Sequence, residues 1–228
     1  MRLGVKLLLV AAAVLAAGIL IGFYVSHLTT LAGSASYSVP VQEVNGQKVV
    51  NLQIQTVAAV GPKLSRNPDW VSYLIRNSSG QWKRETVWNL PTNATVRVTI
   101  FNFDGASGLR NPYLARPQGM VGNTVLIDGK PANAIDPNDA SHTFAVPQLG
   151  IIVALPGVAD DAKHPCGFAP CSISKNDHRT IKFTFHTPAK PGTFRWQCFV
   201  PCAAGWVFGF GGPMQTIGYM DGYLNVSA

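Results

Sequence analysis

Hydrophobic and polar residues follow two distinct patterns along the chain. The first is an apolar run from Leu7 to Ser26, twenty residues without a charge. At about 1.5 Å per residue, a helix of that length crosses a hydrocarbon layer of about 30 Å. Arg2 and Lys6 precede the run, which places the amino terminus in the cytoplasm by the positive-inside tendency. We therefore expect a single-pass anchor in the cell membrane over 1–28, with the rest of the chain extracytoplasmic.

A cleaved signal peptide is the alternative to a retained anchor. The segment AGSAS that follows the run offers small residues to a signal peptidase. However, the run is longer than the roughly 7–15 apolar residues of a typical signal peptide, which favours retention. Residues 29–40 are small, polar and aperiodic, and we expect them to form a tether.

The second pattern is alternation with a period of two, which predicts half-buried strands. In 49–57 the apolar positions are Val50, Leu52 and Ile54, and the polar positions between them are Asn51, Gln53 and Gln55. Further strand candidates lie at 70–76, 94–103, 180–187 and 192–200. No segment after the anchor keeps a helical period. The pattern therefore predicts an all-β domain over 41–228, an antiparallel β-sandwich or barrel.

Two long segments between the strand candidates are rich in glycine, proline and asparagine, 104–123 and 159–177. Loops of this length in a compact domain are usually functional or bind a partner. The first contains Arg110 and Arg116, so we consider it a candidate docking loop, although exposed basic loops are common.

Charge and motif content narrow the function classes. Removing Arg2 and Lys6 from the eighteen basic residues leaves sixteen against eleven acidic ones. This mild positive bias favours an acidic redox protein or an anionic lipid surface as partner. The chain lacks a Lys/Arg run and an RNA-type aromatic motif, so we do not expect nucleic-acid binding. It also lacks a recognisable catalytic constellation, and we expect an electron-transfer or accessory component rather than an enzyme acting alone.

The four cysteines form two pairs, Cys166 with Cys171 and Cys198 with Cys202. An even number in an oxidising compartment favours two disulfides. A domain of this size does not need them to fold, so a metal role stays open. For Cys166 and Cys171 we expect a local disulfide, with zinc binding alongside His164 as the alternative.

For Cys198 and Cys202 three interpretations remain. The pair binds copper, or it forms a disulfide, either locally or crossed to Cys166 and Cys171, since the spacing permits either. The third is a redox-active dithiol like that of copper chaperones with a thioredoxin fold, which the strand pattern here does not match.

Two segments around these residues resemble a known family. DASHTFAVPQLG at 139–150 and KPGTFRWQCFVPC at 190–202 resemble the ligand motifs of the cupredoxin domain of cytochrome c oxidase subunit II, in the same order along the chain. The resemblance covers roughly 91–228 and implies a cupredoxin-like β-sandwich. In that family a dinuclear copper centre accepts electrons from cytochrome c.

Carried over residue by residue, the resemblance implies that His142 is the first imidazole ligand. It makes Cys198 and Cys202 the two bridging thiolates and places Val200 where a backbone carbonyl contacts one copper. The family's methionine ligand has its nearest counterpart in Met214, five residues beyond the family's position.

The chain departs from the family at the second imidazole. That position is occupied by Trp206, and the family's methionine position by Gly209; no histidine follows His186. A second nitrogen ligand would have to come from another part of the domain. The candidates are His164, His178 and His186, and for each a surface position is the more common role.

These observations favour a membrane-anchored, extracytoplasmic, cupredoxin-like protein. We expect His142, Cys198, Cys202 and Met214 to bind copper for electron transfer, or for copper handling, at a respiratory oxidase or another membrane complex. The alternative is a metal-free scaffold, stapled by two disulfides, that serves as an accessory subunit of such a complex.

Overall fold

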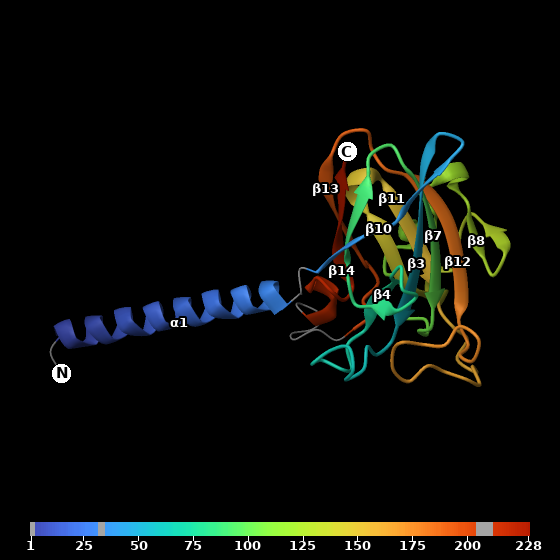
Figure 1. Ribbon diagram of the computed structural model, residues 1–228. Coiled ribbons are helices and arrows are strands. Elements are labelled where there is room, and N and C mark those ends of the chain that lie inside the picture. The colour runs from blue at the N-terminus through green and yellow to red at the C-terminus, as the bar shows by residue number, and fades with distance from the viewer. Residues whose placement is uncertain (1–2, 32–34, 204–211) are drawn as a thin grey trace. The chain divides into compact units, whose positions relative to one another are not determined.

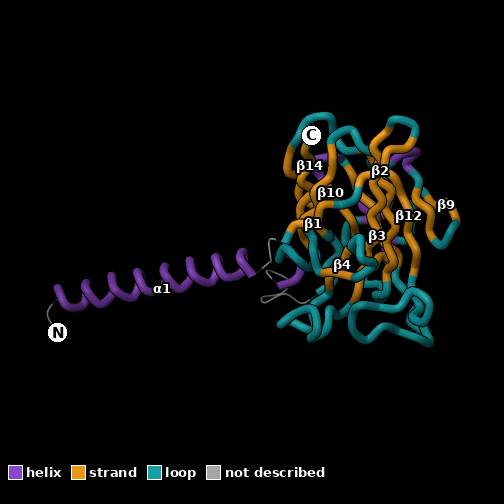
Figure 2. The backbone as a smooth tube through the Cα atoms, in the orientation of Figure 1, coloured by secondary structure: helices purple, strands orange, loops and turns teal. Residues whose placement is uncertain are grey.

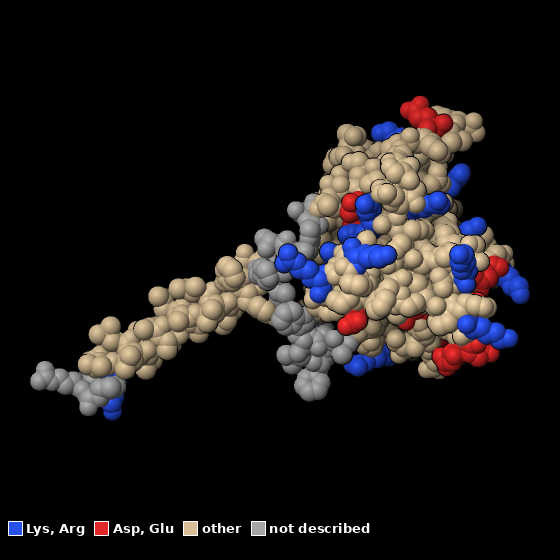
Figure 3. Space-filling model, turned by 60° about the horizontal axis from the view of Figure 1, so that its bottom comes forward, with Lys and Arg blue, Asp and Glu red and all other residues tan. Residues whose placement is uncertain are grey.

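The computed structural model describes residues 3–31, 35–203 and 212–228. The chain divides into two units, residues 1–33 and 34–228. The first contains one helix, α1 (Leu3–Leu31), whose stretch Leu3–Ser26 is long and apolar enough to cross a membrane. Figure 3 shows this helix almost free of charged side chains along its length. A signal sequence would satisfy the same criteria of length and composition.

The second unit is built from two β-sheets (Figures 1 and 2). Within the described residues, one sheet has six strands, in the spatial order β1 (Ser36–Ser38), β6 (Val87–Pro91), β14 (Asp221–Ser227), β13 (Gly192–Gln197), β10 (Ala140–Val146) and β11 (Ile151–Pro156). Strand β1 lies inside the segment expected to form a tether.

The other sheet has eight strands in the part of the chain that the structure describes. Its order is β5 (Trp82–Lys83), β4 (Ser72–Arg76), β3 (Gln47–Val57), β7 (Thr95–Asn102), β12 (Arg179–His186), β8 (Val125–Ile127) and β9 (Lys130–Ala132), with β2 (Val41–Val44) paired to β3. Short 3₁₀ helices join the strands: η1 (Pro112–Ala115), η2 (Val121–Asn123), η3 (Pro137–Asp139), η4 (Pro147–Leu149) and η5 (Gly212–Gln215).

The expectation of a β-sandwich is confirmed, but that of a purely antiparallel one is wrong. Strand β3 pairs in parallel with β7, and β6 pairs in parallel with both β1 and β14. The sheets are therefore mixed, and they do not close into a barrel. Alternation reports which side chains face the core and carries no information on strand direction, so the sequence pattern could not separate the two arrangements.

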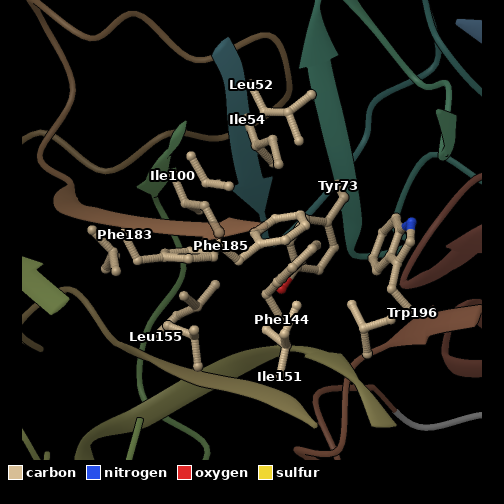
Figure 4. Packing of buried hydrophobic residues seen from close by; sticks show 14 of the residues in the cluster. Leu52, Ile54, Tyr73, Ile100, Phe144, Ile151, Leu155, Phe183, Phe185 and Trp196 are labelled. Carbon is tan, nitrogen blue, oxygen red and sulfur yellow. The ribbon is translucent and has the colours of Figure 1, made fainter. Parts of the chain in front are cut away.

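The apolar faces of the two sheets form one core. Val50, Leu52 and Ile54 on β3 are at most 1% exposed, as the alternation predicts. Aromatic rings fill the space between the sheets (Figure 4): the ring centroids of Trp88 and Trp196 lie 4.9 Å apart, and those of Tyr73 and Trp196 also 4.9 Å. Contacts at this range favour offset and edge-to-face packing, which fixes the relative position of the strands that carry these rings.

The polar face of β3 shows where alternation fails. Gln55 was expected on the exposed face with Asn51 and Gln53, yet it is fully buried. Its side-chain amide donates to the Cys171 carbonyl at 2.8 Å and accepts from the Cys171 N–H at 3.1 Å. The long loop 159–177 therefore folds back over this end of the sheet, and its tertiary contact overrides the local pattern.

The expected disulfide between Cys166 and Cys171 is present and staples that loop. The crossed pairing with Cys198 and Cys202 is thereby wrong, and both of those cysteines are free. Because Cys166 and Cys171 are bonded to each other, zinc binding by this pair is also excluded.

Strand β10 is buried along its whole length. It turns into β11 at Gly150, whose φ of +67° favours glycine because a side chain there would be strained. At its start the register with β11 shifts between Ala140 and His142. Such irregularities re-aim a side chain, and this one stands at the histidine that the sequence singled out.

Candidate metal centre

Three of the four candidate ligands meet at one point of the domain. The ring nitrogen of His142 and the sulfurs of Cys198 and Cys202 all lie within 4.8 Å of one another. His142 Nδ1 is 4.0 Å from Cys198 Sγ, and the two cysteine sulfurs are 3.6 Å apart. The sulfurs are not bonded to each other, so all three groups are available to a metal.

Met214 supplies the fourth candidate donor. Its sulfur lies 3.1 Å from Cys202 Sγ. Backbone hydrogen bonds tie its 3₁₀ helix η5 to the end of β13, because the Met220 N–H donates to Pro213 and the Met220 carbonyl accepts from the Cys198 N–H, both at 3.0 Å. The methionine is thus held beside the cysteine pair although it lies five residues beyond the family's position.

Neighbouring strands place the histidine and the first cysteine. Strands β10 and β13 pair at Ala145 and Gln197, which brings His142 and Cys198 side by side. The Thr143 N–H donates to Cys198 Sγ at 3.3 Å, and the Thr143 hydroxyl accepts from the Phe199 N–H at 2.7 Å. The first cysteine is therefore fixed by the strand that carries the histidine.

The turn after Cys198 positions the second cysteine. The buried carbonyl of Val200 accepts the Cys202 N–H at 2.8 Å and lies 3.6 Å from Cys198 Sγ. This tight turn folds the second sulfur back onto the first. The three-residue spacing therefore produces the sulfur pair by local geometry alone.

Asp104, which the sequence analysis missed, holds the far side of the histidine ring. One of its carboxylate oxygens lies 3.1 Å from His142 Nε2, and the imidazole is fully buried. The ring nitrogen is not well aligned for a hydrogen bond in this arrangement, so we describe the contact as an ion pair. Because Nε2 faces the carboxylate, Nδ1 is the nitrogen that faces the sulfurs.

A buried hub, the hydrogen-bond network around the Asn102 side chain, fixes the backbone of Asp104. The side chain of Asn102 accepts from the Thr56 hydroxyl at 2.5 Å and donates to the Pro156 carbonyl at 2.8 Å. It also accepts from the Asp104 N–H, at 3.3 Å. The only sequence signal for this arrangement is the pair of polar residues Asn102 and Asp104 at the end of a strongly apolar strand.

Burial and charge set the protonation of the metal-free site. Burial lowers the pKa of His142, but Asp104 and Cys198 outweigh it and raise that pKa to about 9. Burial opposes ionisation of Cys198, yet contact with Cys202 and with His142 lowers the Cys198 pKa well below its usual value. The contact with Cys198, together with burial, raises the pKa of Cys202. These shifts favour a thiolate on Cys198 beside a protonated imidazole on His142 when no metal is bound.

The other histidines lie outside this group in the described part of the chain. His164 Nδ1 is 3.8 Å from Asp177, in the disulfide loop. His178 packs against aromatic rings, its ring centroid 5.1 Å from that of Phe103. His186 is exposed, as its strand position predicted. Trp206 and Gly209, which stand at the family's second imidazole and methionine positions, lie outside the described residues.

A hollow of about 600 Å³ reaches Cys198. Arg110 and Arg195 line it together with Phe199 and Met214. Arg195 also forms an ion pair with the buried carboxylate of Asp221. Arg110, from the candidate docking loop, thus lies at the same hollow as the metal-site residues, whereas Arg116 lines a separate one.

Comparisons with known proteins give a structural likeness only. No family model matches the chain, and no curated protein matches it. Among solved structures it is similar to the copper protein rusticyanin, with 18% identity over 89% of this chain and 94% of that one and a TM-score of 0.29. Rusticyanin from Thiobacillus ferrooxidans gives 17% identity over 88% and 92%, with a TM-score of 0.29. A multicopper oxidase gives 14% identity over 85% and 47%, with a TM-score of 0.33.

Proposed function

We propose that this chain is a membrane-anchored, extracytoplasmic, cupredoxin-like protein that binds copper through His142, Cys198, Cys202 and Met214. Its role is electron transfer, or copper handling, at a respiratory membrane complex. The observation that carries the proposal is the convergence of a buried imidazole and two free thiols within 4.8 Å of one another, with a thioether 3.1 Å from the second sulfur.

The donor set fits copper better than the other metals that thiolates bind. Cysteine and imidazole suit zinc as well, but zinc sites draw on Cys, His and carboxylates. A thioether is a soft ligand that selects copper, above all Cu(I). Met214 therefore distinguishes the two metals. When bound, copper supplies a one-electron redox couple.

The protein's own residues orient the donors and exclude water. Asp104 holds the His142 ring with Nδ1 toward the sulfurs, and the Thr143 N–H anchors Cys198. His142 and Cys198 are at most 2% exposed. A dry shell of this kind around a metal tunes its redox potential and limits access by solvent.

We infer the kind of partner from the membrane span and from the charged side chains beside the site. Arg110 at the hollow favours an acidic redox protein as the electron donor or acceptor, whereas the charge of Arg195 is offset by Asp221. Figure 3 shows basic side chains interspersed with acidic ones on the face of the domain that it presents. The motifs at 139–150 and 190–202 support a relation to subunit II of cytochrome c oxidase within this proposal.

The test counts metal and thiols on one sample. The full chain, purified anaerobically in detergent and reduced, is loaded with Cu(I), desalted, and analysed for copper and for free thiols. We expect bound copper in the wild type and none in a Cys198→Ser/Cys202→Ser variant. A wild-type sample with two free thiols and no copper would refute the proposal. Transfer of the bound copper to a metal-free acceptor would identify copper handling, whereas retention with reversible oxidation would identify electron transfer.

The alternative is a metal-free scaffold. It draws on the absence of a second imidazole in the family's position and on the 3.6 Å separation of the sulfurs, which is short enough to close into a disulfide after small movements. It predicts that Cys198 and Cys202 are linked in the native protein. Peptide mapping without reduction distinguishes the two readings, because the Cys166–Cys171 disulfide is common to both.

A further inference from the structure

The donor atoms of the centre limit the number of metal ions that it can hold. A dinuclear centre like that of the family that the chain resembles uses two bridging sulfurs and two imidazoles, besides a methionine and a backbone carbonyl. The described residues offer the two sulfurs, one imidazole and one thioether. We therefore asked whether these donors are arranged around one ion or around two.

The distances fit one tetrahedral ion. With metal–sulfur bonds of about 2.3 Å and a metal–nitrogen bond of about 2.0 Å, tetrahedral ligands lie about 3.8 Å apart for two sulfurs and about 3.6 Å apart for sulfur and nitrogen. The observed distances are 3.6 Å between the cysteine sulfurs and 4.0 Å between Cys198 Sγ and His142 Nδ1. The 3.1 Å between Cys202 and Met214 is shorter, so these two sulfurs would separate by several tenths of an ångström on binding.

A second ion would lack the second imidazole that such a dinuclear centre uses. Residues 203–213 read AAGWVFGFGGP and contain no imidazole, carboxylate, thiol or thioether. His164, His178 and His186 belong to no metal-binding group among the described residues. Among the described residues, the carbonyl of Val200 lies beside Cys198, and it already accepts the Cys202 N–H.

The carboxylate of Asp104 does not replace the absent imidazole. It lies at His142 Nε2, whereas the sulfurs lie at Nδ1 of the same ring. The two nitrogens point away from each other across the imidazole, so the carboxylate and the thiolates are on opposite sides of it. Asp104 can orient the ligand, but it does not complete a second coordination shell.

We infer that the centre holds a single copper ion, bound by two thiolates, one thioether and one imidazole. This inference rests on the proposed copper function and narrows it. The chain would carry one electron on one ion, without the dinuclear centre of the family that it resembles. A set with three sulfurs among four donors also favours the Cu(I) state.

Stoichiometry and spectroscopy test the inference on the full chain in detergent. The protein is reduced anaerobically, loaded with excess Cu(I), desalted, and analysed for copper per chain. The Cys198→Ser/Cys202→Ser variant, treated in the same way, gives the adventitious background to be subtracted. Mild oxidation then permits electron paramagnetic resonance. We expect one copper per chain above background and the hyperfine pattern of an electron on a single copper nucleus.

The outcomes separate the inference from the function on which it rests. Two coppers per chain, with the pattern of an electron shared by two nuclei, would overturn the single-ion site and leave copper binding intact. No copper above background, with the thiols reduced, would overturn both. X-ray absorption gives an independent readout that needs no variant: the single-ion site requires sulfur and nitrogen scatterers without a copper–copper vector.

Discussion

Replacing Asp104 with alanine should weaken copper binding by about tenfold. The substitution removes the carboxylate that lies 3.1 Å from Nε2 of the fully buried His142 ring. An unpartnered buried donor costs about 1–3 kcal/mol, and loss of a group that orients a metal ligand costs about 10–100-fold in affinity. At about 1.4 kcal/mol per tenfold the two ranges overlap. Because the Asp104 side chain is 21% exposed, water can enter the vacated space, which places the loss at the lower end.

The asparagine variant separates the contact from the charge. In Asp104→Asn an oxygen stays beside His142 Nε2 while the charge is lost, so we expect the affinity to stay within a few-fold of the wild type. The assay is anaerobic competition for Cu(I) against a chromophoric chelator, with the full chain in detergent. Asp161→Ala is the matched control, since Asp161 is exposed and has no side-chain partner among the described residues.

Two results would refute this reasoning. One is an Asp104→Ala variant that binds copper within twofold of the wild type while its thermal unfolding shows an intact fold. The other is an Asp104→Asn variant as weak as the alanine variant, because the charge and not the acceptor would then be the source of the effect.

Three further substitutions test the packing around the site. Cys166→Ser/Cys171→Ser should lower the free energy of unfolding by about 2 kcal/mol, the loop-closure value for so short a loop, and leave copper binding unchanged; weaker binding would tie the loop to the site. Asn102→Ala, which removes the hub beneath Asp104, should destabilise by about 1–3 kcal/mol and also weaken copper binding; destabilisation alone would contradict this. Phe185→Ala, in the core, should cost about 3–5 kcal/mol in chemical denaturation, and a loss below 1 kcal/mol would contradict the packing described.

The strands and the core faces could be predicted from the sequence because alternation is a local property. Val50, Leu52 and Ile54 are buried, and β3, β7, β12 and β13 lie close to where the pattern placed them. Strand direction and the burial of Gln55 could not be predicted, since both depend on segments far away in the chain. Gln55 is buried only because the loop that carries Cys171 folds over it.

The same distinction between local and long-range features applies to the candidate site. The spacing of Cys198 and Cys202 encodes the sulfur pair directly, because the turn through Val200 is local. The sequence did not point to Asp104, because this residue follows β7 in one sheet whereas His142 lies on β10 in the other. The two residues meet only when the two sheets pack against each other. The resemblance to a known family pointed to the candidate ligands that lie in motifs, but it did not point to Asp104, which faces one of them.

The way in which the donors are held favours electron transfer over copper delivery. His142 and Cys198 come from paired strands, are buried, and are fixed by Asp104 and by the Thr143 N–H. A metal that changes oxidation state between donors held in this way needs little movement of its ligands, whereas a protein that hands its metal to another must give the acceptor access to it. Among the described residues, the hollow lined by Arg110 and Arg195 reaches the centre at Cys198 and Met214. An acidic partner docked there would lie beside two of the sulfur donors of the centre.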